Sequence, residues 1–255
     1  MTQPLKKPLG HKNYGHIPHL PGSRMGPADH KCHEGQEKIA CKKARDKHDR
    51  IIVQEKLDGS NVGIARINDI LYPLTRAGYL ANTSPFKMHH IFYNWVFENT
   101  NRFMSVLNNG ERLCGEWLLM AHGTIYKLPH EPFVAFDIMT DKHTRMPFDH
   151  LCDRIQNLFI MPHVISDNGP IPIETAMKKL GTFGFHGATE PVEGAVWRVE
   201  RHVLKDKKRG NIAGRKPVVD FIVKYVRPDK IDGKYLSDKD IYNETMVRDQ
   251  KTKKI

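Results

Sequence analysis

The sequence predicts an α+β protein in which antiparallel β-sheets are flanked by helices. Alternation of apolar and polar residues at 51–82, and again at 193–226, is typical of strands in such sheets. Segments with helical spacing lie between these two stretches, which places helices on the outer faces of the sheets. The chain has 255 residues, 39% hydrophobic and 27% charged, so a sizeable core is expected.

The chain begins with a lead-in, predicted over 1–50. Its first part is rich in Pro, Gly and His, which favours an extended course, and the basic stretch EKIACKKARDK favours one short helix. Strands are predicted next in IIVQEKL, NVGIARI and ILYPLTRAGYL, with turns at Asp58-Gly59 and Asn68-Asp69.

One helix is predicted over 84–107, after a Ser-Pro start. Its large apolar residues recur near helical spacing, which predicts that they face the core and that the helix covers the sheet. These residues are Phe86, Ile91, Trp95, Phe103 and Leu107.

The remaining elements complete a domain predicted over 51–228. We expect strands at 112–120 and 133–139, helices at 148–159 and 173–180, and strands at 193–200 and 218–226. Residues 229–255 are mostly polar and are expected to form a short tail.

The charge balance favours a polyanionic partner. The net charge is +11 with the histidines neutral, which attracts polyanions through steering and counterion release. The sequence has no run of 18 or more apolar residues and no apolar segment after its first lysines. We therefore expect no membrane span and no secretory signal, and a cytoplasmic protein.

The four cysteines are scattered and form no CxxC pair, which fits reduced thiols better than a disulfide framework. His30, Cys32, His33 and Cys41 lie close in sequence, but their spacing matches no common zinc template. A looped basic segment is the preferred interpretation of this stretch.

The stretch KLDGSN at 56–61 raises a question about Lys56. It fits a polar turn between strands, and it also fits a lysine nucleophile held beside an acid and an amide. The chain repeats Lys-x-Asp-Gly in KIDGK at 230–234, but no strand-like segment that carries acidic residues follows this copy. We interpret that second copy as a turn only.

What separates the first copy is the series of short motifs around it. KLDGSN resembles motif I of the covalent nucleotidyltransferases, the superfamily of ATP-dependent DNA ligases, RNA ligases and mRNA capping enzymes. Similar matches follow in the expected order: TRAG at 75–78 (motif Ia), CGEW at 114–117 (III), FVAFDI at 133–138 (IIIa), EGAV at 193–196 (IV) and IVKY at 222–225 (V). The resemblance spans 54–225 and implies the ATP-grasp-like nucleotidyltransferase (adenylation) domain of ligases.

The resemblance implies a lysyl–AMP intermediate on Lys56. A lysine attacks the α-phosphate of ATP only as the neutral amine, and its reference pKa is about 10.4, so the site has to favour deprotonation. Lys224 and a divalent metal are the expected sources of positive charge. Mg²⁺, or Mn²⁺ in its place, suits a site with Glu193 as ligand and Asp58 oriented nearby.

The same comparison implies the contacts to the nucleotide. Glu116 is expected to hold a ribose hydroxyl, Arg76 to lie on the ribose-phosphate side, and Phe136 to stack on the purine. Glu55 is placed to accept from the adenine amine, which favours ATP over GTP. Asn61 completes the nucleotide-binding set as the last residue of motif I.

Each of these residues also has a simpler interpretation. Phe136 in an apolar strand is usually a core residue, Glu116 and Glu193 fit charges on an edge strand, and Arg76 fits a solvated loop. The ordered set of motifs favours the nucleotidyltransferase interpretation over these alternatives.

Within the superfamily the sequence favours RNA ligases. Asn61 is typical of the phage-type RNA ligase 2 group, whereas DNA ligases and capping enzymes usually have Arg at this position. Those branches also carry an OB-fold of about 70 or more residues after motif V, and only 229–255 follows here. We expect a bare nucleotidyltransferase domain whose end-joining step depends on the N-terminal segment, the basic loop 201–216 or a separate partner subunit.

Two residues depart from the family pattern. Motif V of RNA ligases normally has Lys-x-Lys, but Ile222 occupies the first lysine position. One contact to phosphate is therefore either missing or supplied by Lys216 or Arg227. Asp58 stands where the closest phage RNA ligases have histidine, a replacement found in many superfamily members.

The predicted activity is the ATP-dependent joining of 5′-phosphate and 3′-hydroxyl ends of RNA, including nicked duplexes or DNA/RNA hybrids. The RNA contact is predicted in the basic loop, although a run of charges is more often a solvated face. Its residues are Lys205, Lys207, Lys208, Arg209 and Arg215. A minimal nick-sealing DNA ligase and a catalytically degenerate nucleic-acid-binding protein are the alternatives.

Overall fold

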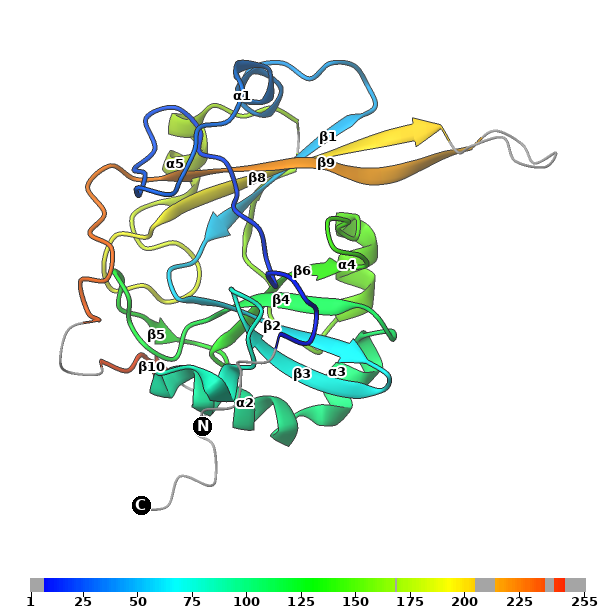
Figure 1. Ribbon diagram of the computed structural model, residues 1–255. Helices are drawn as coiled ribbons and strands as arrows, with labels where there is room; N and C mark the ends of the chain where they lie inside the picture. The colour runs from blue at the N-terminus through cyan, green and yellow to red at the C-terminus, as the bar shows by residue number, and fades with distance from the viewer. Residues whose placement is uncertain (1–6, 168, 205–213, 237–240, 246–255) are drawn as a thin grey trace.

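A computed structural model describes residues 7–167, 169–204, 214–236 and 241–245. Two four-stranded sheets lie one above the other in Figure 1, with the strand orders β7-β1-β8-β9 and β3-β2-β4-β6. Every neighbouring pair within these two sheets is antiparallel. The predicted α+β class, with helices flanking antiparallel sheets, is confirmed.

The upper sheet carries the two longest strands. Its strands are β1 (Asp49–Lys56), β7 (Val164–Ser166), β8 (Gly194–Leu204) and β9 (Arg215–Val226). Helices α1 (Glu34–Cys41) and α5 (Ile173–Leu180) cover its outer face (Figure 1). Ile51, Val53 and Trp197 are fully buried beneath these helices, because alternate residues of a strand point to the same face.

The lower sheet packs against the longest helix. Its strands are β2 (Ser60–Ile67), β3 (Ile70–Thr75), β4 (Arg112–Trp117) and β6 (Phe133–Met139). The helical turn η1 (Ala81–Thr83) and the helices α2 (Lys87–Glu98), α3 (Thr100–Val106) and α4 (Phe148–Ile155) complete this half. Phe92, Trp117 and Phe133 form the aromatic centre of its core.

The single helix predicted over 84–107 is divided in two. Asn99 leaves helical geometry, with φ −110° and ψ 21°, and its side-chain amide donates to the carbonyl of Trp95 at 2.8 Å. An Asn that bonds the backbone in this way competes with helix continuation. The predicted core position of Phe86 is also wrong, since this side chain is 59% exposed at the start of α2, whereas Phe103 and Leu107 are buried as predicted.

The two predicted turns have different roles. Asn68 and Asp69 both have positive φ and join β2 to β3 as a tight hairpin, as predicted. Asp58 and Gly59 instead carry the chain from β1 in the upper sheet to β2 in the lower sheet, and these two strands are not paired. Lys56 therefore ends a strand at the point where the chain passes between the sheets.

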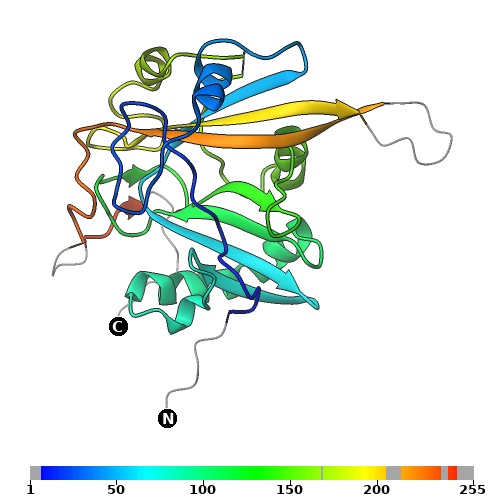
Figure 2. The same ribbon diagram turned by 45° about the horizontal axis from the view of Figure 1, so that its top comes forward.

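The N-terminal segment runs over both sheets. The amide of Asn13 donates to the carbonyl of Arg76 beside the lower sheet, and the amide of Leu20 donates to the carbonyl of Lys224 in β9. Figure 2 shows this segment crossing in front of the space between the sheets. The proposed division into 1–50, 51–228 and 229–255 stays a prediction.

The last described residues return to the body of the protein. Strand β10 (Glu244–Thr245) pairs in parallel with β5 (Lys127–Leu128). None of the helices in the described residues is long and apolar enough to cross a membrane.

Candidate active site

A cavity of about 800 Å³ opens between the two sheets. Its walls come from the ends of β1, β8 and β9, from β2, β4 and β6, and from the N-terminal segment. A volume of this size suits a ligand as large as a nucleotide. All nine predicted catalytic and nucleotide-binding residues line it: Glu55, Lys56, Asp58, Asn61, Arg76, Glu116, Phe136, Glu193 and Lys224.

Lys56 lies at the centre of this cavity. It is the last residue of β1 and pairs with Gly194 at the start of β8, which brings its amine to Glu193, a residue 137 positions away. Lys56 Nζ donates to Glu193 Oε2 at 2.5 Å, and the Lys56 side chain is 21% exposed. The lysine thus faces an enclosed acidic partner rather than bulk solvent.

A second lysine contacts the same carboxylate. Lys230 Nζ donates to Glu193 Oε1 and to Asp58 Oδ1, each at 2.8 Å. Burial raises the pKa of Glu193, but the charges of Lys56 and Lys230 outweigh it and hold that pKa below its ordinary value. Burial likewise lowers the pKa of Lys230, and the two carboxylates more than reverse that effect.

Lys230 was not among the predicted site residues, and the prediction that KIDGK forms only a turn is wrong for this side chain. The turn is present, with Gly233 at φ +63°, yet Lys230 is only 6% exposed. The repeat of Lys-x-Asp-Gly was the signal that could have drawn attention to it.

Neither predicted substitute for the missing motif V lysine reaches the cavity. Ile222 lines it, but Lys216 pairs with Val203 near the far end of β8 and β9. Arg227 donates to the carbonyls of Val192 and Pro191. Within the described chain, Lys216 and Arg227 are absent from the cavity wall, which favours the other alternative, that this contact is missing.

Asp58 holds the backbone segments beside Lys56 together. Its Oδ2 accepts from the amide of Gly123 at 2.8 Å, and its own amide donates to the hydroxyl of Tyr126 at 3.2 Å. The residue is 5% exposed. Asp58 therefore ties the chain after β1 to the loop after β4 and to Lys230.

Glu116 and Asn61 face each other across β4 and β2. Glu116 Oε1 accepts from the amide of Gly59 at 3.0 Å, and burial raises the pKa of Glu116 to about 7. Asn61 Oδ1 is buried without a protein partner among the residues that the structure describes. An unsatisfied acceptor in a cavity wall is suited to a polar group of a ligand.

Phe136 lies at a β-bulge. Gly115 pairs with Ala135 and Cys114 with Asp137, which leaves Phe136 as the extra residue of β6. It is half-buried and lines the cavity, with the Tyr14 ring edge-on at 5.1 Å. The bulge explains why an aromatic residue of an apolar strand faces the cavity instead of the core.

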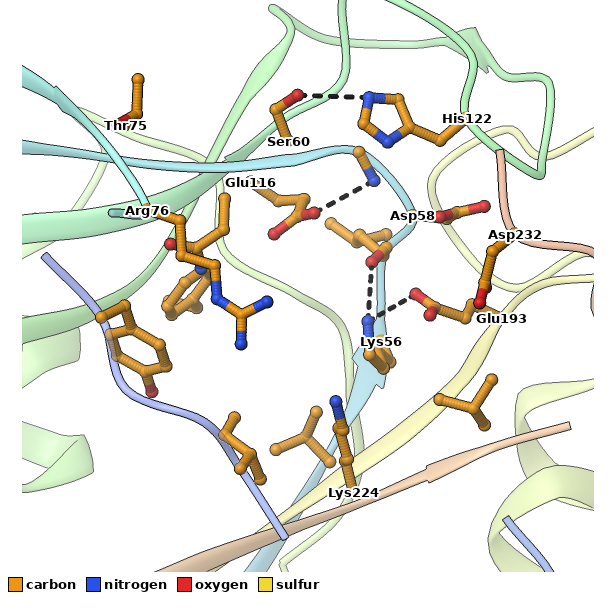
Figure 3. A pocket seen from close by; sticks show the side chains of 18 of the residues that line it. Lys56, Asp58, Ser60, Thr75, Arg76, Glu116, His122, Glu193, Lys224 and Asp232 are labelled. Atoms are coloured by element: carbon orange, nitrogen blue, oxygen red, sulfur yellow. Dashed lines mark hydrogen bonds and ion pairs between the residues drawn. The ribbon is translucent and has the colours of Figure 1, made fainter. Parts of the chain in front are cut away.

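Arg76 and Lys224 bring positive charge from opposite walls. Figure 3 shows the side chains of Arg76, Lys56 and Lys224 directed into the same space. Burial, together with the charge of Lys56, lowers the pKa of Lys224, whose Nζ lies 3.6 Å from Asp29 Oδ1. Arg76 Nη2 lies 3.4 Å from His16 Nδ1. The N-terminal segment, whose role the sequence left open, therefore contributes to the site.

Glu55 points away from Lys56, as expected for successive residues of a strand. Its Oε2 accepts from the amide of Phe185 at 2.9 Å, its Oε1 is buried without a partner in the described chain, and burial raises its pKa to about 7. The side chain thus packs against the 183–185 loop, and its predicted role at the adenine edge stays a prediction.

The donor set suits ATP with a hard divalent cation. The described residues hold no cluster of three or more His, Cys, Asp and Glu side chains placed for a metal. Mg²⁺ is usually held by one or two carboxylates together with substrate phosphates, and Glu193 can supply that carboxylate. Phe136 and Tyr14 also line the cavity and offer it an aromatic surface.

The predicted RNA contacts are only partly within the described chain. Lys205, Lys207, Lys208 and Arg209 lie outside the described residues. Arg215 is exposed at the start of β9, and its Nη1 donates to the carbonyl of His202 at 2.8 Å.

The solved structures that match this chain include ligases. An apo mutant of the RNA ligase of Naegleria gruberi is 16% identical, with a TM-score of 0.49, over 88% of this chain and 59% of that chain. An ATP-dependent RNA ligase from an archaeon is 20% identical, with a TM-score of 0.36, over 71% and 44%. A putative ATP-dependent DNA ligase from Aquifex aeolicus is 17% identical, with a TM-score of 0.43, over 84% and 49%.

The chain thus spans about three fifths of the Naegleria enzyme and less of the other two. No curated protein matches it. A family model, RNA ligase, matches residues 49–226, from the first residue of β1 to the last residue of β9. This match includes both sheets and most of the cavity wall, and the chain therefore belongs to the RNA ligase family.

Proposed function

We propose that the protein is an ATP-dependent RNA ligase that joins 5′-phosphate and 3′-hydroxyl ends. The observation that carries this proposal is the contact of Lys56 Nζ with Glu193 Oε2 inside a nucleotide-sized cavity. Family membership supports the substrate class. The joining of two RNA ends then proceeds through three transfer steps, each of which is a nucleophilic substitution at phosphorus.

In the first transfer, Lys56 Nζ attacks the α-phosphorus of ATP. Lys56 reacts after its proton has been released to solvent; the N–P bond then forms, and the bond from the α-phosphorus to pyrophosphate breaks. Lys224 and Arg76 stabilise the negative charge on the phosphate oxygens. Glu193 would hold a divalent cation, which we propose to be Mg²⁺, and that cation would supply further charge neutralisation.

The two later transfers use the lysyl–AMP. An oxygen of the RNA 5′-phosphate attacks the AMP phosphorus, which releases Lys56 and leaves the RNA end as an adenylylated pyrophosphate. The 3′-hydroxyl then attacks the 5′-phosphorus, so that the phosphodiester forms and AMP leaves. Glu116 and Asn61 are suited to hold ribose hydroxyls, and Phe136 with Tyr14 to bind the base.

The test is covalent labelling. The purified protein is incubated with α-labelled ATP or GTP and Mg²⁺, then denatured. We expect label on the protein with ATP, at least about 100-fold less with Lys56→Ala because the nucleophile is gone, and normal labelling with Lys234→Ala. The absence of an adduct with either nucleotide would support the catalytically degenerate binding protein.

A nicked duplex distinguishes the remaining alternative. We expect sealing when the 3′-hydroxyl strand is RNA, including in a DNA/RNA hybrid, and faster than with an all-DNA nick. Equal or faster sealing of the DNA nick would favour the minimal DNA ligase. We place the activity in cytoplasmic RNA repair, with the basic loop or a partner subunit holding the RNA.

A further inference from the structure

Lys230 is a buried lysine held by three acidic groups. Its Nζ lies 2.8 Å from Asp58 Oδ1, 2.8 Å from Glu193 Oε1 and 3.4 Å from Asp232 Oδ1, and the residue is 6% exposed. A lysine is seldom buried to this extent unless its charge is compensated. The position of the Lys230 side chain is therefore fixed by the carboxylates around it and not by contact with solvent.

The backbone around Lys230 is docked against the loop after β4. The amide of Tyr235 donates to the carbonyl of His122 at 2.8 Å. At Gly123 an added Cβ would approach the Ile231 carbonyl to 2.6 Å and Lys230 Cε to 3.1 Å. Glycine is thus needed for this close approach, which brings Lys230 into the cavity wall.

Lys230 completes the contacts of Glu193. Glu193 Oε2 accepts from Lys56 and Oε1 accepts from Lys230, so the carboxylate is fixed between two ammonium groups. Asp58, in turn, accepts a hydrogen bond from Lys230 on one carboxylate oxygen and from the amide of Gly123 on the other. Removal of the Lys230 ammonium would take away the donor to Glu193 Oε1 and leave the carboxylate free to rotate away from Lys56.

We propose that Lys230 is a positioning residue for nucleotidyl transfer, which holds the Glu193 carboxylate against Lys56. Lys230 is the second lysine in contact with Glu193. It adds positive charge to a cavity in which Ile222 occupies the position of the first motif V lysine. This inference rests on the proposed function. The effect of Lys230 is expected on the rate of bond formation more than on the binding of ATP, because its contacts are to protein carboxylates.

The experiment measures single-turnover formation of the lysyl–AMP as a function of ATP concentration. Lys230→Met keeps the approximate length of the side chain and removes the charge. We expect the maximal rate to fall about 10- to 100-fold, as is typical when a group that orients a catalytic residue is removed. The ATP concentration for half-maximal rate should change less than about 3-fold, since the variant keeps every residue expected to bind ATP.

Further variants complete the comparison. Lys234→Met is the matched control, because Lys234 belongs to the same KIDGK stretch but pairs with the partly exposed Glu190 at 2.7 Å; it should label at the wild-type rate. Lys230→Arg keeps the positive charge and should recover a rate at least about 3-fold above that of Lys230→Met. If Lys230→Met does not fold, the double variant Asp58→Asn/Lys230→Met removes one buried acid along with the lysine and should fold. Since Asp58 is itself a residue of the site, the single variant Asp58→Asn is measured beside it, and the double variant should be slower than Asp58→Asn.

Several outcomes would overturn the inference. These are a wild-type maximal rate in Lys230→Met or in the double variant, a parallel loss of rate and ATP affinity, or an Arg variant no faster than the Met variant. Failure of the proposed function is distinguishable, because the wild-type protein itself would then take no label.

Discussion

Glu55 and Lys56 show how neighbouring residues acquire different roles. Strand alternation turns Lys56 toward the space between the sheets and Glu55 toward the 183–185 loop. Glu55 is 2% exposed, and one of its oxygens has no partner among the described residues. Such a carboxyl is more stable in its neutral form, which is why its pKa rises to about 7.

This pKa predicts a stability effect that depends on pH. Since the folded pKa of Glu55 is raised, its favourable neutral form is fully present below the ordinary value of 4.5 and is lost as the pH rises through about 7. We expect Glu55→Gln to raise the free energy of unfolding at pH 8 by up to about 3 kcal/mol, with most of that gain absent at pH 5. Denaturant unfolding at the two pH values measures it.

The exposed Glu98 at the end of α2 is the control for this experiment. Glu98→Gln should show no comparable difference between the two pH values. An equal gain from Glu55→Gln under both conditions would contradict the raised pKa as its cause.

At the scale of elements, the start of β8 decides where Glu193 lies. Gly194 pairs with Lys56 on one side and with Val226 on the other. A Cβ at Gly194 would lie 1.9 Å from the carbonyl oxygen of Tyr225. Glycine therefore allows β9 to approach closely beside the carboxylate of Glu193.

Gly194→Ala should separate β8 from β9 and displace Glu193. We expect a decrease of about 1–3 kcal/mol in stability, as for other overpacked positions, and slower lysyl–AMP formation. Thermal unfolding and covalent labelling measure the two effects. Gly35→Ala in α1, where an added Cβ meets no atom within 4 Å, should instead keep or slightly raise stability. Equal behaviour of the two variants would contradict a role for close strand approach at Gly194.

At the scale of the whole molecule, the site exists because two sheets face each other. β1 ends in one sheet, Asp58 and Gly59 carry the chain across, and β2 continues in the other. The N-terminal segment then covers the gap, with Leu20 bound to β9 and Asn13 beside β3. The protein that encloses this cavity has a net charge of +11, which favours a polyanionic substrate.

That charge predicts salt-dependent binding of RNA. We expect the affinity for single-stranded RNA to fall linearly with salt on a double logarithmic plot. Replacing five basic residues by Ala should weaken binding and reduce the slope by about 0.7 for each phosphate that the protein no longer neutralises. These residues are Lys205, Lys207, Lys208, Arg209 and Arg215. Fluorescence anisotropy at several salt concentrations measures both quantities.

The control removes the same number of charges elsewhere. Five exposed lysines, Lys43, Lys47, Lys87, Lys142 and Lys179, are changed to Ala. An equal decrease of affinity in both variants would argue against the basic loop as the RNA contact.

The sequence by itself determined the local elements and the identity of most site residues. Alternation and helical spacing depend on neighbours in the chain, so strands such as β1, predicted at 51–57 and observed at Asp49–Lys56, and the hairpin at Asn68-Asp69 were predictable. The order of the short motifs pointed to Lys56 and Glu193, which the fold brings into contact. The break at Asn99 was not predictable from spacing, because a side-chain hydrogen bond ends the helix there.

Only the tertiary structure decided how these parts face one another. It placed β1 and β2 in different sheets, turned Glu55 away from Lys56, and buried Lys230 between Asp58 and Glu193. The physical reason is that an ion pair such as Lys56–Glu193 joins residues 137 positions apart. Patterns among near neighbours report the faces of single elements, whereas burial and charge pairing depend on which elements pack together.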